Sequence, residues 1–211
     1  MKSIAMTVCP IAFFVSGLVL AGAAQAQDAG LYGRAADPNA SFVRVVAFDQ
    51  QVATIAGKPV SPAQGVSPYV NVDPGSIEIS SGGKNASMKV EPGKYYTMTI
   101  GPDGERIFSD TVKNDPAKAQ LYLYNLSDIP NIDLFVPAAK ALALKGVESG
   151  QSKDVALKAP LSLAFEVQKD GTKVAGTDPI DIKRKAGYSI VVTGANGQYK
   201  AVALENNLLQ R

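Results

Sequence analysis

Short runs of β-branched and aromatic residues alternate with turn-forming residues along most of the chain. At this close spacing the pattern is typical of an all-β sandwich or barrel, and almost no helical periodicity competes with it. Turn sequences such as Asp73-Pro74-Gly75 and Glu91-Pro92-Gly93 fall between the runs. In the first half we therefore expect strands at residues 41–48, 52–56, 69–72, 75–80, 86–90, 95–100 and 107–111.

The second half repeats this order after a polar interruption at residues 113–118, which we interpret as a linker. Residues 140–145 have a helix-favouring composition but leucines at period two, and we assign them to a strand. The pattern predicts two tandem β-sandwich domains, at residues 27–114 and 115–211, each a copy of a unit of about seven strands. The other strands are expected at residues 120–125, 152–157, 161–168, 178–183, 188–193 and 199–204. They match, in order, residues 41–48, 69–72, 75–80, 86–90, 95–100 and 107–111, so that Tyr188 matches Tyr95.

The first 26 residues have the pattern of a secretory signal peptide. Lys2 precedes an apolar run at residues 8–20, and Ala24-Gln25-Ala26 is a small-x-small cleavage site. The apolar run is shorter than the roughly 20 residues that a membrane-spanning helix needs. We therefore expect cleavage of residues 1–26 and export of a soluble mature chain to the periplasm.

The amino-acid composition removes most catalytic chemistry. The chain has no histidine, and its one cysteine, Cys9, lies in the expected signal peptide. The usual general base, the commonest metal ligand and the thiol nucleophile are therefore all missing from the expected mature chain. A formal net charge of +2 favours neither nucleic acid nor an anionic membrane as a partner. We expect no catalytic residue, no metal site and no cofactor.

Carboxylates remain, and they are the groups that calcium binding and glycoside hydrolysis need. The closest acidic pair of the second half, Asp178 and Asp181, is better explained as a turn that enters a strand. Glu78 lies between Ile77 and Ile79, which is the usual position of an outward-facing residue on a strand. The acidic residues therefore indicate no site of either kind.

Two groups of side chains suggest binding surfaces. Tyr122 and Tyr124 are two residues apart on one expected strand, so both point to the same face. They either cover the rim of the core, contact a partner protein, or form an aromatic platform for a glycan. Arg44 shares a strand face with Phe42 and Val46, which indicates a covered surface where the guanidinium needs acceptors. The alternative for Arg44 is an edge charge that discourages strand pairing.

An apolar pair, Leu31 and Tyr32, follows the expected cleavage site and precedes the first expected strand. Leaving this pair in water is costly, so we expect it to dock. It either folds back onto its own domain or joins Arg44 in binding a partner. The candidate partner-binding residues are therefore Leu31, Tyr32, Arg44, Tyr122 and Tyr124.

Short motifs in a fixed order resemble the alginate biosynthesis protein AlgF family. Ala29-Gly30-Leu31-Tyr32-Gly33, followed by Ser41-Phe42-Val43-Arg44-Val45, is similar to the opening of that family, and Asn125-Leu126-Ser127-Asp128 is similar to the matching point of its second half. The first strand departs from the family pattern, because it continues as Ala47-Phe48-Asp49-Gln50 rather than into an Asn-containing turn.

The resemblance implies a periplasmic accessory factor in exopolysaccharide O-acetylation, with a membrane-bound O-acyltransferase and periplasmic acetyltransferases as partners. No catalytic residue is carried over, because none matches. Our leading hypothesis is a non-catalytic adaptor for O-acetylation of alginate or a related polysaccharide. The alternatives are a carbohydrate-binding protein that contacts the polymer directly and a periplasmic sandwich chaperone.

Overall fold

The computed structural model describes residues 39–48, 51–101, 104–113 and 115–209. Their regular structure is β-strand apart from one 3-10 turn at Pro137–Ala139, so the all-β prediction is confirmed. No helix in these ranges is long and apolar enough to span a bilayer. The expected signal peptide at residues 1–26 and the pair Leu31 and Tyr32 lie outside the described residues.

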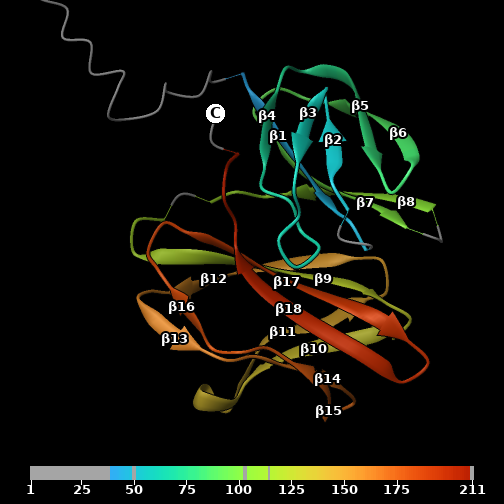
Figure 1. The fold of residues 1–211 in the computed structure, drawn as a ribbon. Coiled ribbons are helices and arrows are strands. Elements are labelled where there is room, and N and C mark those ends of the chain that lie inside the picture. The colour runs from blue at the N-terminus through green and yellow to red at the C-terminus, as the bar shows by residue number, and fades with distance from the viewer. Residues whose placement is uncertain (1–38, 49–50, 102–103, 114, 210–211) are drawn as a thin grey trace, which may run out of the picture. The chain divides into compact units, whose positions relative to one another are not determined.

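The described part of the first half folds as two sheets (Figure 1, blue to green). One sheet has the strand order β4-β1-β7-β8 and the other has the order β3-β2-β5-β6. In the first sheet β1 and β7 run parallel. Val43, Ile79 and Met98 are among the residues that form one core from both sheets. The strands are β1 (Ser41–Val46), β2 (Ala53–Ile55), β3 (Lys58–Val60), β4 (Val70–Val72), β5 (Gly75–Ser81), β6 (Lys84–Val90), β7 (Tyr95–Gly101) and β8 (Gly104–Asp110).

The described part of the second half also pairs two such sheets (Figure 1, yellow to red). Their orders are β12-β9-β17-β18 and β11-β10-β14-β15, and β13 pairs with β16 as an addition. Leu123, Leu134 and Val192 belong to the core of this half. The strands are β9 (Lys118–Ser127), β10 (Asn131–Val136), β11 (Ala141–Glu148), β12 (Ser152–Lys158), β13 (Leu161–Leu163), β14 (Glu166–Lys169), β15 (Thr172–Gly176), β16 (Ile180–Ile182), β17 (Gly187–Ala195) and β18 (Gln198–Glu205).

The two halves repeat one topology. β9, β12, β17 and β18 take the places of β1, β4, β7 and β8, and the pair β9 and β17 is parallel again. In the same way β10, β11, β14 and β15 take the places of β2, β3, β5 and β6. The predicted repeat is therefore present, although the unit is larger than expected because the short strands β3, β10 and β15 were not predicted. β3 contains Pro59 and β15 follows Gly171, and both residues ordinarily mark turns.

Two details of the predicted alignment are wrong. Residues 178–183 do not match 86–90, since β15 holds the place of β6 and β16 pairs with β13. Tyr188 matches Tyr96 rather than Tyr95: each hydroxyl accepts the backbone N–H of the residue five positions earlier, from Lys183 at 2.9 Å and from Glu91 at 3.3 Å. A shift of one residue exchanges the two faces of a strand, so this error exchanged inward and outward positions. The assignment of 140–145 to a strand is confirmed by β11.

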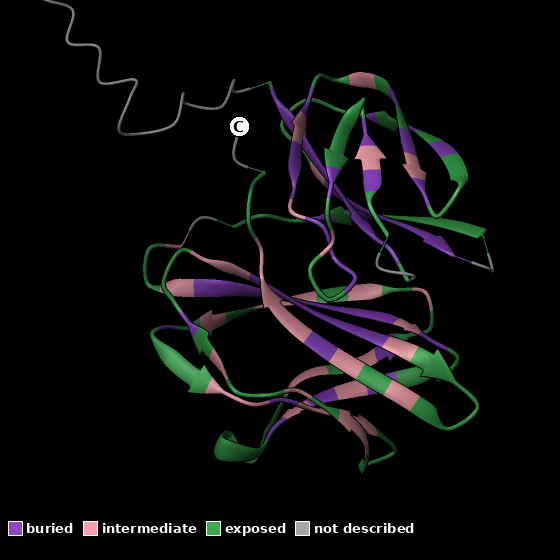
Figure 2. Ribbon diagram, in the orientation of Figure 1, coloured by how far each residue is buried: buried purple, intermediate pink, exposed green. Residues whose placement is uncertain are grey.

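The strands β1, β7, β9 and β17 are buried along most of their length, as Figure 2 shows in purple. One face of β1 and of β9 covers the core of its own half. Val46 and Phe108 of the first half meet Tyr122, Tyr124 and Val191 of the second half in a separate apolar cluster. The described residues fall in one compact unit, and the division between residues 114 and 115 stays a prediction.

Candidate functional site

The most polar group of buried side chains surrounds Arg44 on β1, whose exposed fraction is 1%. Its Nε donates to the Thr97 hydroxyl at 2.8 Å, and its Nη1 donates to the Asn206 side-chain oxygen at 2.7 Å. Its Nη2 donates to the hydroxyls of Tyr124 at 3.0 Å and Ser189 at 2.7 Å. Every guanidinium nitrogen therefore has an acceptor, and the acceptors come from both halves of the chain.

Asp110, at the end of β8, is the counter-charge of this network and is 6% exposed. Thr97 donates to one carboxylate oxygen at 2.5 Å, and Tyr69 donates to the same oxygen at 2.8 Å. Tyr124 donates to the other oxygen at 2.5 Å. Thr97 and Tyr124 thus accept from Arg44 and donate to Asp110, so two hydroxyls connect the buried charges. Hydrogen bonds with a charged partner are roughly twice as strong as neutral ones.

The ionisation of the network follows from its burial. Burial is the largest cause that raises the pKa of Tyr69 and of Tyr124 well above the usual phenol value, and it outweighs the opposite effect of Arg44. Burial alone would lower the pKa of Arg44, but nearby Tyr124, Tyr69 and Asp110 raise it. At neutral pH the phenols stay protonated and the guanidinium stays charged, so these phenols act as donors and not as general bases.

The network joins equivalent positions of the two repeats. Thr97 directly follows the tyrosine Tyr96 and pairs with Arg44 across the parallel strands. Ser189 follows the matching Tyr188 and pairs with Tyr122 in the same way. Arg44 and Tyr122 are therefore equivalent, and so are the two hydroxyl residues.

Asp110 and Asn206 are a second equivalent pair. Asp110 pairs with Tyr95, the residue before Tyr96. Asn206 donates its backbone N–H at 2.8 Å to the carbonyl of Gly187, the residue before Tyr188. One repeat thus supplies an acid and the other the neutral amide of the same shape. Arg44 donates directly to Asn206 and is connected to Asp110 through the hydroxyls of Thr97 and Tyr124.

The structure brings Arg44, Tyr122 and Tyr124 together, as part of one covered region. The prediction of a covered face with acceptors for Arg44 is confirmed, and the alternative of an edge charge is wrong because β1 lies between β4 and β7. Tyr122 and Tyr124 are 4% and 0% exposed, so neither ring is available as an open platform for a glycan. Tyr122 donates its hydroxyl to the Thr111 carbonyl at 2.9 Å. Partner binding by these three residues stays a prediction.

Sequence reasoning missed the other members of the network. Thr97 and Ser189 each lie between apolar residues on a predicted strand. With the correct alignment, the sequence would have shown that they occupy equivalent positions on the same face of the two repeats. Tyr69 and Asp110 are at strand ends, where the pattern does not fix the direction of a side chain. Asn206 follows the last strand and carries no sequence signal at all.

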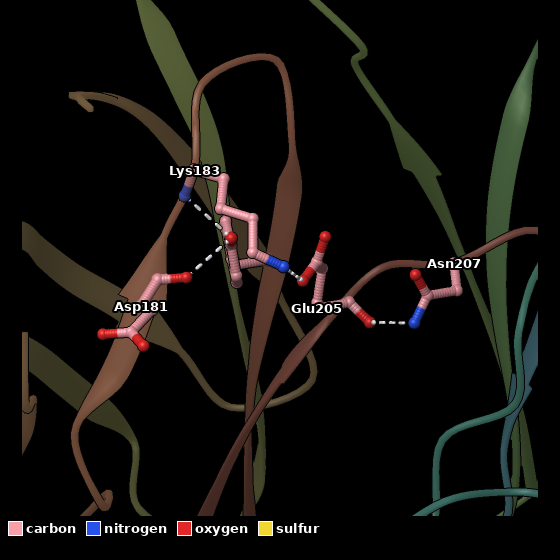
Figure 3. Close-up of polar contacts among 5 residues, drawn as sticks. Asp181, Lys183, Glu205 and Asn207 are labelled. Atoms are coloured by element: carbon pink, nitrogen blue, oxygen red, sulfur yellow. Dashed lines mark hydrogen bonds and ion pairs between the residues drawn. The ribbon is translucent and has the colours of Figure 1, made fainter. Parts of the chain in front are cut away.

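The C-terminal segment after β18 connects the two halves. The Tyr69 N–H donates to the Asn207 carbonyl at 2.8 Å, and the Leu209 N–H donates to the Tyr69 carbonyl at 2.7 Å. Figure 3 shows how its base is held: the Lys183 ammonium lies 2.9 Å from a Glu205 carboxylate oxygen, and the Asn207 amide donates to the Glu205 carbonyl at 3.3 Å. The segment is therefore placed by backbone pairing and by contacts with the turn that precedes β17.

Two hollows at the surface of the described residues concern the site, and the first of them is lined in part by Tyr69 and Asn206 of the buried network. A cleft of about 160 Å³ beside the C-terminal segment is lined by Lys113, Lys118, Lys185, Tyr95 and Asn207 among others. A wider, open groove of about 590 Å³ lies over β5 and β6, where exposed Glu78 faces outward as predicted. In the described ranges no three acidic side chains come together in a way that could hold a metal ion.

Comparisons with known proteins point to one family. The family described as "Alginate O-acetyl transferase AlgF" matches residues 15–189. The chain is 26% identical over 190 residues to an "Alginate biosynthesis protein AlgF" of Pseudomonas aeruginosa, covering 87% of both chains. It is 26% identical over 200 residues to the protein of that name from Pseudomonas fluorescens, covering 87% of this chain and 86% of the relative.

A solved structure is similar in sequence to part of the chain. It is the C-terminal domain of AlgF from P. aeruginosa, with 22% identity and a TM-score of 0.38. The match covers 43% of this chain and 99% of that domain.

Proposed function

We propose that this chain, which belongs to the AlgF family of alginate biosynthesis, is a non-catalytic adaptor for the O-acetylation of alginate or a related exopolysaccharide. In this proposal it works in the periplasm after removal of residues 1–26. It binds periplasmic O-acetyltransferases and a membrane-bound O-acyltransferase complex, and these partners carry the catalytic groups. The word transferase in the name of the family does not assign chemistry to any residue of this chain.

The observation that carries the proposal is that the Arg44 network is buried and that its polar groups already have hydrogen-bond partners. An acetyltransferase of the serine type needs a hydroxyl that is both open to substrate and next to a base. In the part of the chain that the structure describes, the shortest hydroxyl–carboxylate hydrogen bonds are those of Thr97 and Tyr124 to Asp110, and all three side chains are buried. Among the described residues no buried side-chain nitrogen or oxygen lacks a partner. The cluster therefore fits a structural role better than a reactive one.

The sequence supports the same conclusion beyond the described residues. No histidine is present in all 211 residues, so no serine has the base that usually activates it. An adaptor needs a fixed arrangement of surfaces, and the network supplies one by tying Thr97 of one repeat and Ser189 of the other to a single guanidinium. This is the property that we assign to the fold.

The first experiment asks whether the purified mature chain transfers acetyl groups. We expect no release of acetate from an acetyl ester and no transfer to polymannuronate above the rate in buffer. Turnover that persists through purification and disappears in a single variant such as Ser87→Ala, in the open groove, would contradict the adaptor proposal.

A second experiment tests the partner-binding segment. The variant Leu31→Ser with Tyr32→Ser should leave the melting temperature unchanged, abolish capture of the acetyltransferase and leave the polymer unacetylated in cells. A lower melting temperature with intact capture would instead place the pair on its own domain. If neither quantity changes, both roles proposed for the segment are wrong.

A further inference from the structure

We propose that the acetyltransferase partner docks on β6, by adding to its free edge an extended segment in which apolar residues alternate with basic ones. β6 (Lys84–Val90) is the last strand of the sheet β3-β2-β5-β6, so one of its sides has no neighbouring strand (Figure 1). An edge strand presents unpaired backbone donors and acceptors, on which a segment of another chain can continue the sheet. This inference rests on the proposed function, because that function supplies the partner.

The pairing of β5 with β6 decides which backbone groups of β6 point outward. The Ala56 N–H donates to the Glu78 carbonyl at 2.9 Å, so the backbone groups of Glu78 point to the side of β2. Glu78 is opposite Ser87, and in an antiparallel pair such positions alternate with hydrogen-bonded ones. The N–H and carbonyl groups of Asn85, Ser87 and Lys89 therefore point away from β5. Among the described residues these outward groups have no hydrogen-bond partner.

The equivalent strand of the second repeat is protected against such an addition. β15 packs against β18, and its pairing with β14 contains a register shift between Val167 and Gln168. β6 pairs with β5 over all of its seven residues without a shift, and it contains no proline. Covered or irregular edges prevent strand addition. The first repeat thus leaves open an edge that the second repeat closes.

An apolar side chain is exposed beside the open edge. β6 contacts β7 of the facing sheet, and β8 extends that sheet one strand further. Ile107 on β8 is 50% exposed, although it pairs with Met98, a residue of the core. Paired residues share a face, so Ile107 is directed to the core side at the open margin of the sandwich. A strand added to β6 would lie opposite β8 and cover Ile107 with its own apolar residues.

The groove over β5 and β6 indicates the charge of the added segment. Two acidic side chains, Glu78 and Glu105, line this groove, and no basic side chain does. Both acids are exposed, and neither forms an ion pair with another described residue. Glu105 shares a face of β8 with Ile107, so the acidic lining and the apolar contact adjoin. The lysines of β6, Lys84 and Lys89, lie outside the lining. A segment with lysine or arginine between its apolar residues is complementary to this surface.

The test measures amide hydrogen exchange of the mature chain, resolved by residue, with and without the purified periplasmic O-acetyltransferase of the same organism. We expect the amides of Asn85, Ser87 and Lys89 to exchange at least about tenfold more slowly in the complex, because each gains an acceptor. The amides of Ala86 and Met88 point to β5, and their exchange is the internal comparison.

The variants Ser87→Pro and Ser87→Ala separate backbone pairing from side-chain contact. Both remove the same exposed hydroxyl, but only proline removes the outward N–H, and it breaks no hydrogen bond to β5. We expect Ser87→Pro to weaken capture of the acetyltransferase at least about tenfold and Ser87→Ala to weaken it less than about twofold. The melting temperature of each variant is measured first, to establish that it is folded.

A second pair of variants leaves the backbone of β6 unchanged. Ile107→Thr and Leu142→Thr each replace an exposed apolar residue on a strand, with exposed fractions of 50% and 44% in the native chain. Leu142 lies on β11 of the second repeat. We expect Ile107→Thr to weaken capture about threefold and Leu142→Thr to leave it unchanged.

Several results would overturn the proposal. They are unchanged exchange of the three outward amides in a complex that forms, equal capture by the two Ser87 variants, and equal capture by Ile107→Thr and Leu142→Thr. Slow exchange of the same amides without the partner, increasing with protein concentration, would assign the edge to a second copy of this chain instead. If the acetyltransferase binds and the outward amides do not change, the edge inference is wrong and the adaptor proposal is unaffected. If it does not bind the native chain, the adaptor proposal fails as well.

Discussion

The two repeats share a topology but differ in charge at the place where they meet. In the first repeat β1 presents Arg44 there and β8 presents Asp110, whereas the equivalent positions of the second repeat hold Tyr122 and Asn206. The hydroxyl positions are nearly the same in both, Thr97 and Ser189. Among the buried residues described at this contact, only those of the first repeat are charged, and the second repeat provides neutral acceptors.

The difference shows why two copies of one unit must diverge where they pack together. Identical copies would place a second buried arginine and a second buried acid in the same region. A buried charge is costly unless it is paired and hydrogen-bonded. Replacing Arg by Tyr and Asp by Asn keeps the hydrogen-bonding groups of the second copy and removes their charge. The contact is therefore specific for one orientation of unlike copies.

The largest effect is expected from removing Arg44, the charged donor of the network. Arg44→Met should lower the free energy of unfolding by about 3–5 kcal/mol, because it removes the buried cation that offsets the charge of Asp110 and leaves only neutral donors around that carboxylate. Urea unfolding at pH 7 measures this loss. Arg106→Met, at an exposed position of β8, should cost less than about 1 kcal/mol.

Adding Asp110→Asn to Arg44→Met makes the first repeat resemble the second and should restore part of the lost stability. If Arg44→Met costs no more than Arg106→Met, the buried network does not hold the two repeats together.

Introducing the arginine of the first repeat at the equivalent position of the second repeat should also lower the free energy of unfolding. Tyr122→Arg places a second guanidinium in the same covered region and should lower stability by about 2–4 kcal/mol. Tyr122→Phe removes only the hydrogen bond to the Thr111 carbonyl and should cost about 1 kcal/mol. Equal losses in the two variants, measured by thermal and urea unfolding, would mean that charge at this contact is irrelevant.

The matched hydroxyls allow a finer comparison. Thr97→Val removes an acceptor of Arg44 and a donor to Asp110, and should cost about 2 kcal/mol. Ser189→Ala should cost about 1 kcal/mol, because the same Nη2 still donates to Tyr124. If Ser189→Ala lowers stability more than Thr97→Val, the contacts from the second repeat, and not the hydrogen bond to Asp110, contribute most to the stability of the network.

The smallest expected effect is on the pH dependence of stability. Burial raises the folded-state pKa of Tyr69, Tyr122 and Tyr124 above the unfolded value of about 10. The unfolded chain then releases these protons first as the pH rises, so stability is constant well below pH 10, begins to fall as the pH approaches 10, and falls further above it. We expect a loss of about 1 kcal/mol between pH 8 and pH 10.

Tyr69→Phe should make this decline shallower when urea midpoints are compared across the same pH range. A decline that is identical in the variant would assign it to groups outside the network.

The sequence predicted the fold well where alternation was regular. The predicted runs at residues 41–48, 120–125 and 188–193 each contain only two polar side chains, with tyrosine counted as apolar, and each forms a central strand. The repeat was also visible, because turns recur in the same order. The alignment failed by one residue because Tyr95 and Tyr96 are adjacent in the sequence. In the structure Tyr96, and not Tyr95, accepts the Glu91 N–H, as Tyr188 accepts that of Lys183.

The site was less predictable, for a physical reason. Arg44 could be identified because an arginine among apolar residues needs acceptors. Its acceptors are Thr97, Asn206, Tyr124 and Ser189, up to 162 positions away in sequence. Pairing of β1 with β7 brings Thr97 to Arg44, and packing of the second repeat on the first brings the other three. Long-range packing of this kind leaves no local pattern in the chain.

The adaptor role is tested most directly by titration in a reconstituted acetylation reaction. The acetyltransferase partner, acetyl donor and polymer are held constant while the mature chain is added. An adaptor raises acetylation until its amount matches that of the partner, after which the rate stays constant, and it does nothing when the partner is omitted. Full acetylation at trace amounts of this chain, or transfer without the partner, would contradict the account.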